Sequence, residues 1–338
     1  MRRRWRPLAA VVSVLAIVVG ATSCSNSGGN DELLIYNAQH ESLTKEWIDA
    51  FTKETGVKVT YRQGGDTELG NQLVAEGDKS PADVFLTENS PAMAAVERAG
   101  LFADLDADTL NQVPAQYRPS SGKWTGVAAR TTVFVYNKTK LQPDQLPKSL
   151  LDLQEPAWKG RWGAPPTKAD FQAIVAALLQ LKGEAATAQW LSAMKANAKI
   201  YNDNIATLKA VNAGEVDGGV IYHYYWFRDQ AKTKEMSGNT ALHYFRNQDP
   251  GAFVSLSGGG VLKSSKKLQQ AQQFIRFITG KAGQEVLEKG DSFEYPVGSG
   301  VPANPALVPL TDLQAPAVDP STLDAQKVSD LMTKAGLL

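Results

Sequence analysis

The chain has 338 residues, with 35 Lys and Arg against 35 Asp and Glu, three His and one Cys. A chain of this length is expected to form one very large or two moderate domains. The balanced charge and the lack of a basic patch argue against nucleic-acid binding, and a single cysteine excludes an internal disulfide.

Residues 1–23 have the pattern of an export signal. Four arginines within the first six residues precede an apolar run from Leu8 to Val19, and small residues then lead to Cys24. This is the order of basic region, hydrophobic core and cleavage site, and the apolar run is too short to span a bilayer as a mature helix. Removal of residues 1–23 would leave 31 Lys and Arg against 35 Asp and Glu, so the mature protein is mildly acidic.

Cys24 ends the run Ala21-Thr-Ser-Cys24, which resembles a lipobox, in which the cysteine is lipidated and becomes the new N-terminus. The following residues, 24–31, are rich in Ser, Asn and Gly, as in a flexible tether. We therefore expect an extracytoplasmic protein that a lipid anchors to the cell membrane. A chance cysteine near an ordinary signal peptide, or twin-arginine export of the folded chain, is the alternative.

The mature chain alternates short apolar strands with amphipathic helices, which predicts an α/β architecture. The segments 131–136 and 255–262 are interpreted as two crossings between two lobes with a cleft between them. Ser90 and Pro91 are expected to cap and open a helix, and the Pro-rich stretch 302–320 is expected to be an extended surface connection. Strands are expected at 33–36, 57–61, 83–86, 131–136, 216–221 and 255–262, and helices at 43–51, 69–75, 92–98, 171–181, 185–196, 224–231, 268–278 and 324–335.

The doublet Tyr224-Tyr225 lies where a predicted strand gives way to a predicted helix. Neighbouring side chains of a strand point to opposite faces, so the two phenols can converge only where the chain leaves the strand. Two phenolates there would suit a hard trivalent cation. The alternative is amphipathic packing beside Trp226 and Phe227.

A series of motifs runs through the mature chain: Tyr36-Asn-Ala-Gln-His40, Ser80-Pro-Ala-Asp-Val-Phe85 followed by Glu88, Trp158-Lys-Gly-Arg161, Lys182-Gly-Glu-Ala-Ala186, Tyr224-Tyr-Trp226, Asp249-Pro-Gly-Ala252, Gly260-Val-Leu-Lys-Ser-Ser265 and Glu294-Tyr-Pro296. Their order resembles the ferric-ion-binding proteins of bacterial ABC iron importers. The resemblance implies a type II periplasmic-binding-protein fold, with two α/β lobes joined by a strand hinge around the ligand cleft. With the two crossings, the N-terminal lobe is expected at 32–131 plus 256–307 and the C-terminal lobe at 132–255 plus 308–338.

The same resemblance implies four ligands for Fe(III): His40, Glu88, Tyr224 and Tyr225. Fe(III) favours phenolate and carboxylate oxygens and tolerates one imidazole. A free tyrosine has a pKa of about 10, but a trivalent cation would displace the phenolic proton. His223 precedes the matched pair and is interpreted as its neighbour, with an extra ligand as the alternative, and His243 lies outside the matched motifs.

About two octahedral positions would remain for a synergistic anion (carbonate, phosphate or citrate) or for water. Where many members of the resembled family have Thr-Ser-Gly-Ala, this chain has Thr167-Lys-Ala-Asp170. The lost glycine and the added acid weaken the case for a phosphate held by backbone amides. The side chains considered for an anion are Arg130, Lys168, Asn204 and Tyr222.

The expected function is capture of Fe(III) outside the cytoplasmic membrane and its delivery to the permease and ATPase of an importer, by a monomer that is not an enzyme. An organic solute such as a polyamine, sugar phosphate or phosphonate is the alternative ligand. A lipid-anchored extracellular enzyme is a further alternative. The sequence contains neither a Gly-x-Ser-x-Gly elbow nor a His-Glu-x-x-His helix.

Overall fold

The computed structural model describes residues 32–338, and nine strands form the framework of this part. The strands are β1 (Leu33–Asn37), β2 (Val59–Gln63), β3 (Val84–Leu86), β4 (Trp124–Asn137), β5 (Trp162–Ala164), β6 (Ala198–Ile200), β7 (Gly218–Tyr222), β8 (Thr240–His243) and β9 (Val254–Val261). Their order is β2-β1-β3-β9-β4-β7-β5-β6, and β8 pairs with β4. Pairing is parallel within β2-β1-β3 and within β7-β5-β6, and antiparallel wherever β4 or β9 takes part.

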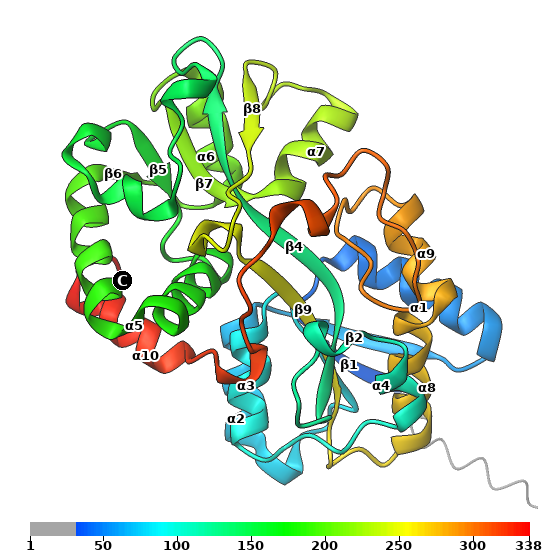
Figure 1. Cartoon of the computed structure of the whole chain (residues 1–338). Helices are drawn as coiled ribbons and strands as arrows, with labels where there is room; N and C mark the ends of the chain where they lie inside the picture. The colour runs from blue at the N-terminus through cyan, green and yellow to red at the C-terminus, as the bar shows by residue number, and fades with distance from the viewer. Residues whose placement is uncertain (1–31) are drawn as a thin grey trace, which may run out of the picture. The chain divides into compact units, whose positions relative to one another are not determined.

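Strand β4 joins two groups of strands (Figure 1). From Trp124 to Thr131 it pairs with β9, and from Thr132 onward it pairs with β7 and β8. The first lobe is built on β1, β2, β3 and β9, and the second on β5, β6, β7 and β8. The two segments predicted as crossings therefore lie in β4 and β9, although β4 begins earlier than expected, at Trp124.

The helices follow from periodic apolar side chains and from stop signals. In the first helix Leu43, Trp47 and Phe51 are buried on one side, and the helix ends at Gly56 with φ +73, a conformation that glycine adopts without strain. The helices are α1 (Glu41–Thr55), α2 (Asp66–Glu76), α3 (Ser90–Arg98), α4 (Ala107–Asn111), α5 (Ala169–Asn197), α6 (Asn204–Ala213), α7 (His223–Lys232), α8 (Leu268–Thr279), α9 (Lys281–Lys289) and α10 (Ala325–Lys334).

One helix start differs from the sequence-based expectation, and one pair of predicted helices is confirmed. The cap of α3 is Asn89, not Ser90, which is the first helical residue and donates a hydrogen bond to the carbonyl oxygen of Leu256. The helices predicted at 171–181 and 185–196 are confirmed as two helical segments within the range labelled α5, which meet at a kink at Gly183, with φ +80 and ψ 173. Glycine adopts this conformation without strain.

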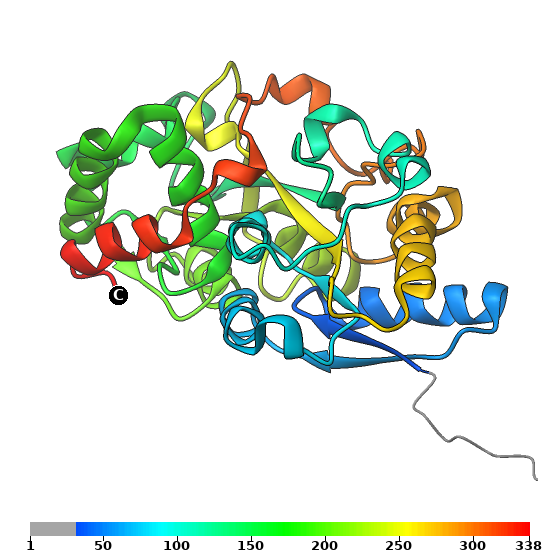
Figure 2. The same ribbon diagram turned by 90° about the horizontal axis from the view of Figure 1, so that it is seen from below.

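Each lobe has its own apolar core. In the first, Phe51 and Phe274 meet edge to face with ring centroids 5.1 Å apart. In the second, Trp190 packs on Trp162 and Phe171. Helix α10 packs along α5 in the second core, as expected for the final helix (Figure 2). Residues 32–338 form one compact unit, and the residue bounds of the lobes stay a prediction.

Helix α3 packs directly on β9 because that strand contains consecutive glycines. A Cβ atom at Gly258 would lie 2.4 Å from Cγ of Met93, and one at Gly260 would lie 2.6 Å from the ring of Phe102. Contacts this short are not tolerated, so glycine is required for this approach. The close packing fixes the start of α3, which carries the site residues that follow β3.

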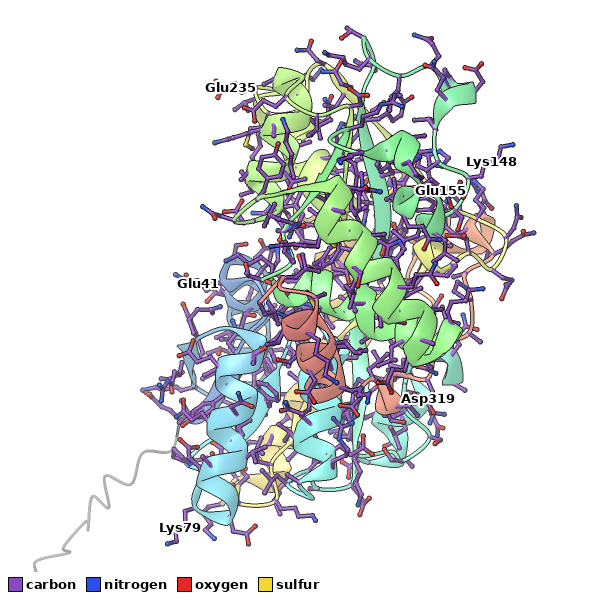
Figure 3. The ribbon with its side chains drawn as sticks, turned by 90° about the vertical axis from the view of Figure 1, so that its left-hand side faces the viewer. Glu41, Lys79, Lys148, Glu155, Glu235 and Asp319 are labelled. Atoms are coloured by element: carbon purple, nitrogen blue, oxygen red, sulfur yellow. The ribbon has the colours of Figure 1, made fainter. Side chains whose placement is uncertain are left out.

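The surface of residues 32–338 carries charged side chains of both signs. Examples are the exposed residues labelled in Figure 3: Glu41, Lys79, Lys148, Glu155, Glu235 and Asp319. No helix within residues 32–338 combines the length and the apolar character that a membrane crossing needs. The export signal and Cys24 lie outside the described residues.

Candidate metal centre

His40 is held between β1 and α1, in the loop where the sequence motif placed it. It is the residue before the first turn of α1, and its backbone N–H donates to Oε1 of Gln39 at 2.7 Å. Its Nδ1 lies 2.5 Å from Oε1 of Glu88. Burial alone would lower the pKa of His40, but the charge and the hydrogen bond of Glu88 raise it above the ordinary value.

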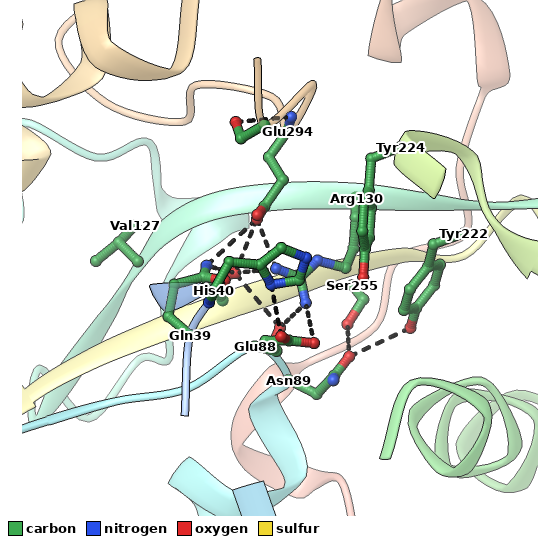
Figure 4. A network of polar contacts seen from close by, with 12 residues as sticks. Gln39, His40, Glu88, Asn89, Val127, Arg130, Tyr222, Tyr224, Ser255 and Glu294 are labelled. Carbon is green, nitrogen blue, oxygen red and sulfur yellow. Dashed lines mark hydrogen bonds and ion pairs between the residues drawn. The ribbon is translucent and has the colours of Figure 1, made fainter. Parts of the chain in front are cut away.

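Glu88 follows β3 and precedes α3, so it faces His40 from the neighbouring parallel strand. Nη1 of Arg130 donates to the backbone carbonyl oxygen of Glu88 at 2.6 Å and lies 3.6 Å from Oε2. Burial would raise the pKa of the Glu88 carboxyl, but His40 and Arg130 together lower it. The carboxylate is therefore charged and held in place (Figure 4).

Tyr224 and Tyr225 lie in the first turn of α7, directly after β7. Their rings are 4.2 Å apart at 31°, and the ring of His40 meets that of Tyr224 edge-on at 5.0 Å. The hydroxyl groups converge on Oδ2 of Asp170, at 3.4 Å for Tyr224 and 3.0 Å for Tyr225. The helix start thus brings the two phenols together, as the sequence indicated.

Both phenols are neutral in these surroundings. Burial, followed by the nearby charge of Asp170, raises the pKa of Tyr224 and of Tyr225 well above the ordinary value. A cation entering the site would therefore have to displace two phenolic protons. The structure thus brings together all four ligands expected from the sequence: His40 touches Glu88 and Tyr224, and Tyr224 touches Tyr225.

Asp170 is a site residue that the sequence-based reasoning did not assign. It is the second residue of α5, and only 4% of it is exposed. Besides the two tyrosines, Nδ2 of Asn204 donates to Oδ2 at 2.9 Å and Nδ2 of Asn89 donates to Oδ1 at 2.9 Å. Burial and the charge of Glu88 raise the pKa of Asp170. Its carboxylate therefore lies between the tyrosines of one lobe and Glu88 of the other.

Of the four side chains considered for an anion, one contacts Asp170 and one contacts Asn89, which is itself bonded to Asp170. Asn204 donates to its carboxylate, and the hydroxyl of Tyr222 donates to Oδ1 of Asn89 at 3.4 Å. The acid was interpreted from sequence as a feature that repels an anion. In the structure, the amides and hydroxyls that could hold an anion converge on the acid itself.

Of the two cations considered for an anion, Arg130 lies beside Glu88 and Lys168 lies at the surface. Arg130 is completely buried, and its Nη2 contacts Oε2 of Glu294 at 2.5 Å and Oγ of Ser257 at 2.7 Å. Gln39 donates to the same two oxygens. Lys168 is exposed at the residue before α5. The guanidinium thus contacts protein oxygens through both terminal nitrogens, and the lysine lies at the surface.

His223 and His243 do not face the site. Nδ1 of His223 accepts from the backbone N–H of Thr131 at 3.2 Å, and Nε2 contacts the carbonyl oxygen of Phe293 at 2.8 Å. Burial lowers the pKa of His223 to about 3, so the ring is neutral. His243 contacts the carbonyl oxygen of Pro147. His223 therefore acts as a structural neighbour that ties α7 to β4.

The donor set depends on the tyrosines. Across residues 32–338, His, Cys, Asp and Glu side chains alone do not converge in groups of three or more that could hold a metal ion. Adding the phenols gives one imidazole, two phenolic oxygens and the carboxylates of Glu88 and Asp170. This is a set for a hard, highly charged ion rather than for Zn²⁺ or Cu⁺.

Comparison with known proteins shows the family of the chain. The model of the family described as bacterial extracellular solute-binding protein matches residues 79–327. The chain is 63% identical over 332 residues to the Fe(3+)-binding periplasmic protein of Serratia marcescens, with 98% of this chain and 97% of that protein covered. Two solved structures, from Pseudomonas aeruginosa and from Trichodesmium, confirm the periplasmic-binding-protein fold.

Iron-bound HitA from Pseudomonas aeruginosa shares 42% identity and a TM-score of 0.84, covering 90% of this chain and 99% of its own. Trichodesmium FutA, solved in complex with iron and citrate ligands, shares 27% identity and a TM-score of 0.80, covering 91% of this chain and 100% of its own. The family model matches more than half of the chain, and the similarity to these three relatives covers nearly all of it. This chain belongs to the family of bacterial extracellular solute-binding proteins.

Proposed function

We propose that the chain binds Fe(III) at this site, outside the cytoplasmic membrane, and hands the ion to an ABC importer. The observation that carries the proposal is the convergence of two adjacent phenols with a histidine and a glutamate from the other lobe. The Serratia relative is named for Fe(3+) binding and the Pseudomonas structure is iron-bound, which supports the same cargo here.

The donor chemistry fits a trivalent ion. Tyr224 and Tyr225 would lose their protons to become phenolates, and with Glu88 they would cancel three positive charges. His40 would bind as a neutral imidazole, so its proton and its ion pair with Glu88 would be given up when the metal enters. Iron binding on this scheme releases protons, and acid therefore weakens it.

Asp170 would add a second carboxylate to the site. It already faces both phenols through Oδ2, and Asn204 supports that oxygen from the side. In our proposal Asp170 takes the place that a synergistic anion would fill, so carbonate, phosphate or citrate is not required for binding. Citrate, which accompanies iron in the FutA structure, or water would then fill only the remaining position.

Closure of the lobes around the ion couples binding to movement. His40 and Glu88 come from the first lobe, whereas Tyr224, Tyr225 and Asp170 come from the second. The ion can contact all of them only when the lobes are together, so binding favours the closed arrangement. We propose that a monomer, anchored through lipidated Cys24, presents this closed form to the permease and ATPase. The protein carries out no reaction on its cargo.

A visible-absorption titration tests the proposal. Purified mature protein titrated with ferric nitrilotriacetate should develop a phenolate-to-iron charge-transfer band that saturates at one ion per chain and disappears with excess chelator. The same titration in buffer freed of bicarbonate, phosphate and citrate should give the same band. If no band appears in any buffer and a polyamine or phosphonate raises the melting temperature of the protein, an organic solute is favoured instead.

A further inference from the structure

Asn89 lies at the centre of a polar junction between the two lobes. The residue is 1% exposed, and its carboxamide contacts four side chains from different elements. Nδ2 donates to Oδ2 of Asp66 at 3.0 Å and to Oδ1 of Asp170 at 2.9 Å. Oδ1 accepts from Oγ of Ser255 at 3.0 Å and from the hydroxyl of Tyr222 at 3.4 Å.

The orientation of this carboxamide is fixed by its partners. Carboxyl oxygens of Asp66 and Asp170 lie against the NH₂ group and accept its two hydrogens, while the hydroxyls of Ser255 and Tyr222 donate to the amide oxygen. The reverse orientation would place the amide oxygen against two carboxylates. All hydrogen-bonding positions of Asn89 are therefore used, with two donors toward the acids and one acceptor toward the hydroxyls. Figure 4 shows the contacts of the amide oxygen with Ser255 and Tyr222.

The junction connects opposite sides of the metal centre. Asp66 begins α2 and Asn89 caps α3, both in the first lobe, whereas Asp170 belongs to α5 in the second. Asp66 also accepts the backbone N–H of Glu88 at 2.9 Å. One neutral side chain thus holds a carboxylate of each lobe, directly beside Glu88.

We propose that Asn89 is a positioning residue, which orients Asp170 toward the ion across the interlobe boundary. Its bond to Oδ1 leaves Oδ2 as the oxygen that faces Tyr224 and Tyr225. Asn204 holds Oδ2 and Asn89 holds Oδ1, so loss of Asn89 would leave Oδ1 without its donor and weaken this alignment. This inference rests on the proposed function, because it assigns a role in holding the same ion.

The first test compares iron release from four proteins: wild type, Asn89→Ala, the isosteric Asn89→Asp and the control Ser255→Ala. The loss of a hydrogen bond to a charged group changes an equilibrium constant, here that of iron binding, by about tenfold to a hundredfold. Both Asn89 variants should therefore lose iron to citrate about tenfold to a hundredfold faster, with the charge-transfer band still present because both phenolates remain. Ser255→Ala keeps the bonds to both acids and should stay within about threefold of wild type.

A double-mutant cycle separates positioning from a general structural effect. If Asn89 acts through Asp170, Asn89→Ala should change iron release by less than about twofold in an Asp170→Ala background. An equal loss in both backgrounds would overturn the inference, as would wild-type release rates in both Asn89 variants. If Asn89→Ala fails to fold by circular dichroism, Asn89→Asp is used in the cycle instead. Absence of the iron band in wild type would refute the proposed function itself, whatever the variants do.

Discussion

The sharpest prediction concerns the two phenolic oxygens, because their removal should separate metal binding from stability. Tyr224→Phe and Tyr225→Phe each delete one oxygen and keep the ring. Tyr224 is completely buried between the rings of His40 and Tyr225, and phenylalanine keeps these contacts. Iron binding should nevertheless collapse, since each variant removes a direct anionic ligand.

The magnitudes follow from the contacts of each hydroxyl. The hydroxyl of Tyr224 lies 3.4 Å from Oδ2 of Asp170, a long hydrogen bond, so its loss should cost less than about 1 kcal/mol of unfolding free energy. The hydroxyl of Tyr225 is closer, at 3.0 Å, and its loss should cost about 1.5–3 kcal/mol. Substitutions behind a metal ligand weaken binding about 10–100-fold, so removal of a ligand itself should exceed 100-fold.

The assay measures both quantities on the same samples. Urea unfolding of the metal-free proteins gives the stability order wild type, Tyr224→Phe, Tyr225→Phe, and competition with citrate gives the iron affinities. The visible band should weaken and shift in each single variant and vanish in the double variant. Wild-type affinity and band in both single variants would refute the tyrosine assignment. A loss of binding that only parallels a loss of folding would refute the separation of the two effects.

Three further outcomes are expected. Arg130→Gln should lower the unfolding free energy by roughly 3–5 kcal/mol, because the buried carboxylate of Glu294 loses its cation at 2.5 Å; a urea midpoint equal to that of wild type would contradict this. Metal-free wild type should be more stable than metal-free His40→Gln, and this difference in stability should be largest between pH 4.5 and pH 6.5. Thermal melting of both proteins across this pH range measures it. The His40 contribution is lost as pH rises through its raised folded pKa, and the Glu88 contribution is lost as pH falls through its lowered one; a pH-independent difference would contradict the pairing. Cys24→Ser should release the protein from the membrane fraction and leave the iron titration unchanged, and lipid-modified material recovered from that variant would contradict the lipobox.

The convergence of the four proposed ligands could be predicted from the sequence because each lies at a point that the chain order determines. His40 and Glu88 follow parallel neighbouring strands, so their side chains meet at one sheet edge, and Tyr224 and Tyr225 lie where a strand turns into a helix. Local patterns and the motif order are sufficient for such positions.

Asp170 and Arg130 could not be assigned in the same way. From sequence, the acid near the start of α5 indicated only repulsion of an anion, because the donors around it come from Asn89, Asn204 and the tyrosines, far away along the chain. Arg130 was a candidate anion contact, and nothing in its neighbourhood along the chain showed that Glu294 would lie against it. Contacts of this range become visible only when the fold is known.

Several elements also escaped the sequence-based prediction. Strands β5 and β6 have three residues each, too few to show an alternating pattern. Helix α6 exposes the apolar Ile205 and buries the polar Asn204 and Thr207, so its apolar side chains do not mark the buried side in the sequence. Tertiary packing, rather than local periodicity, determines these elements.

The location of the metal centre beside the partner change of β4 has a mechanical consequence. Arg130, which contacts Glu88, directly precedes the point where the strand leaves β9, and Tyr222, which pairs with Thr132, directly precedes the helix of the tyrosines. The donors therefore lie near the pivot, with short lever arms, whereas the far ends of the lobes have long ones. A force that separates those ends would act on the metal–ligand bonds multiplied by the ratio of the two lever arms. A transporter that binds the outer surfaces of both lobes would therefore need only a small force, applied over a long displacement, to break the metal–ligand bonds.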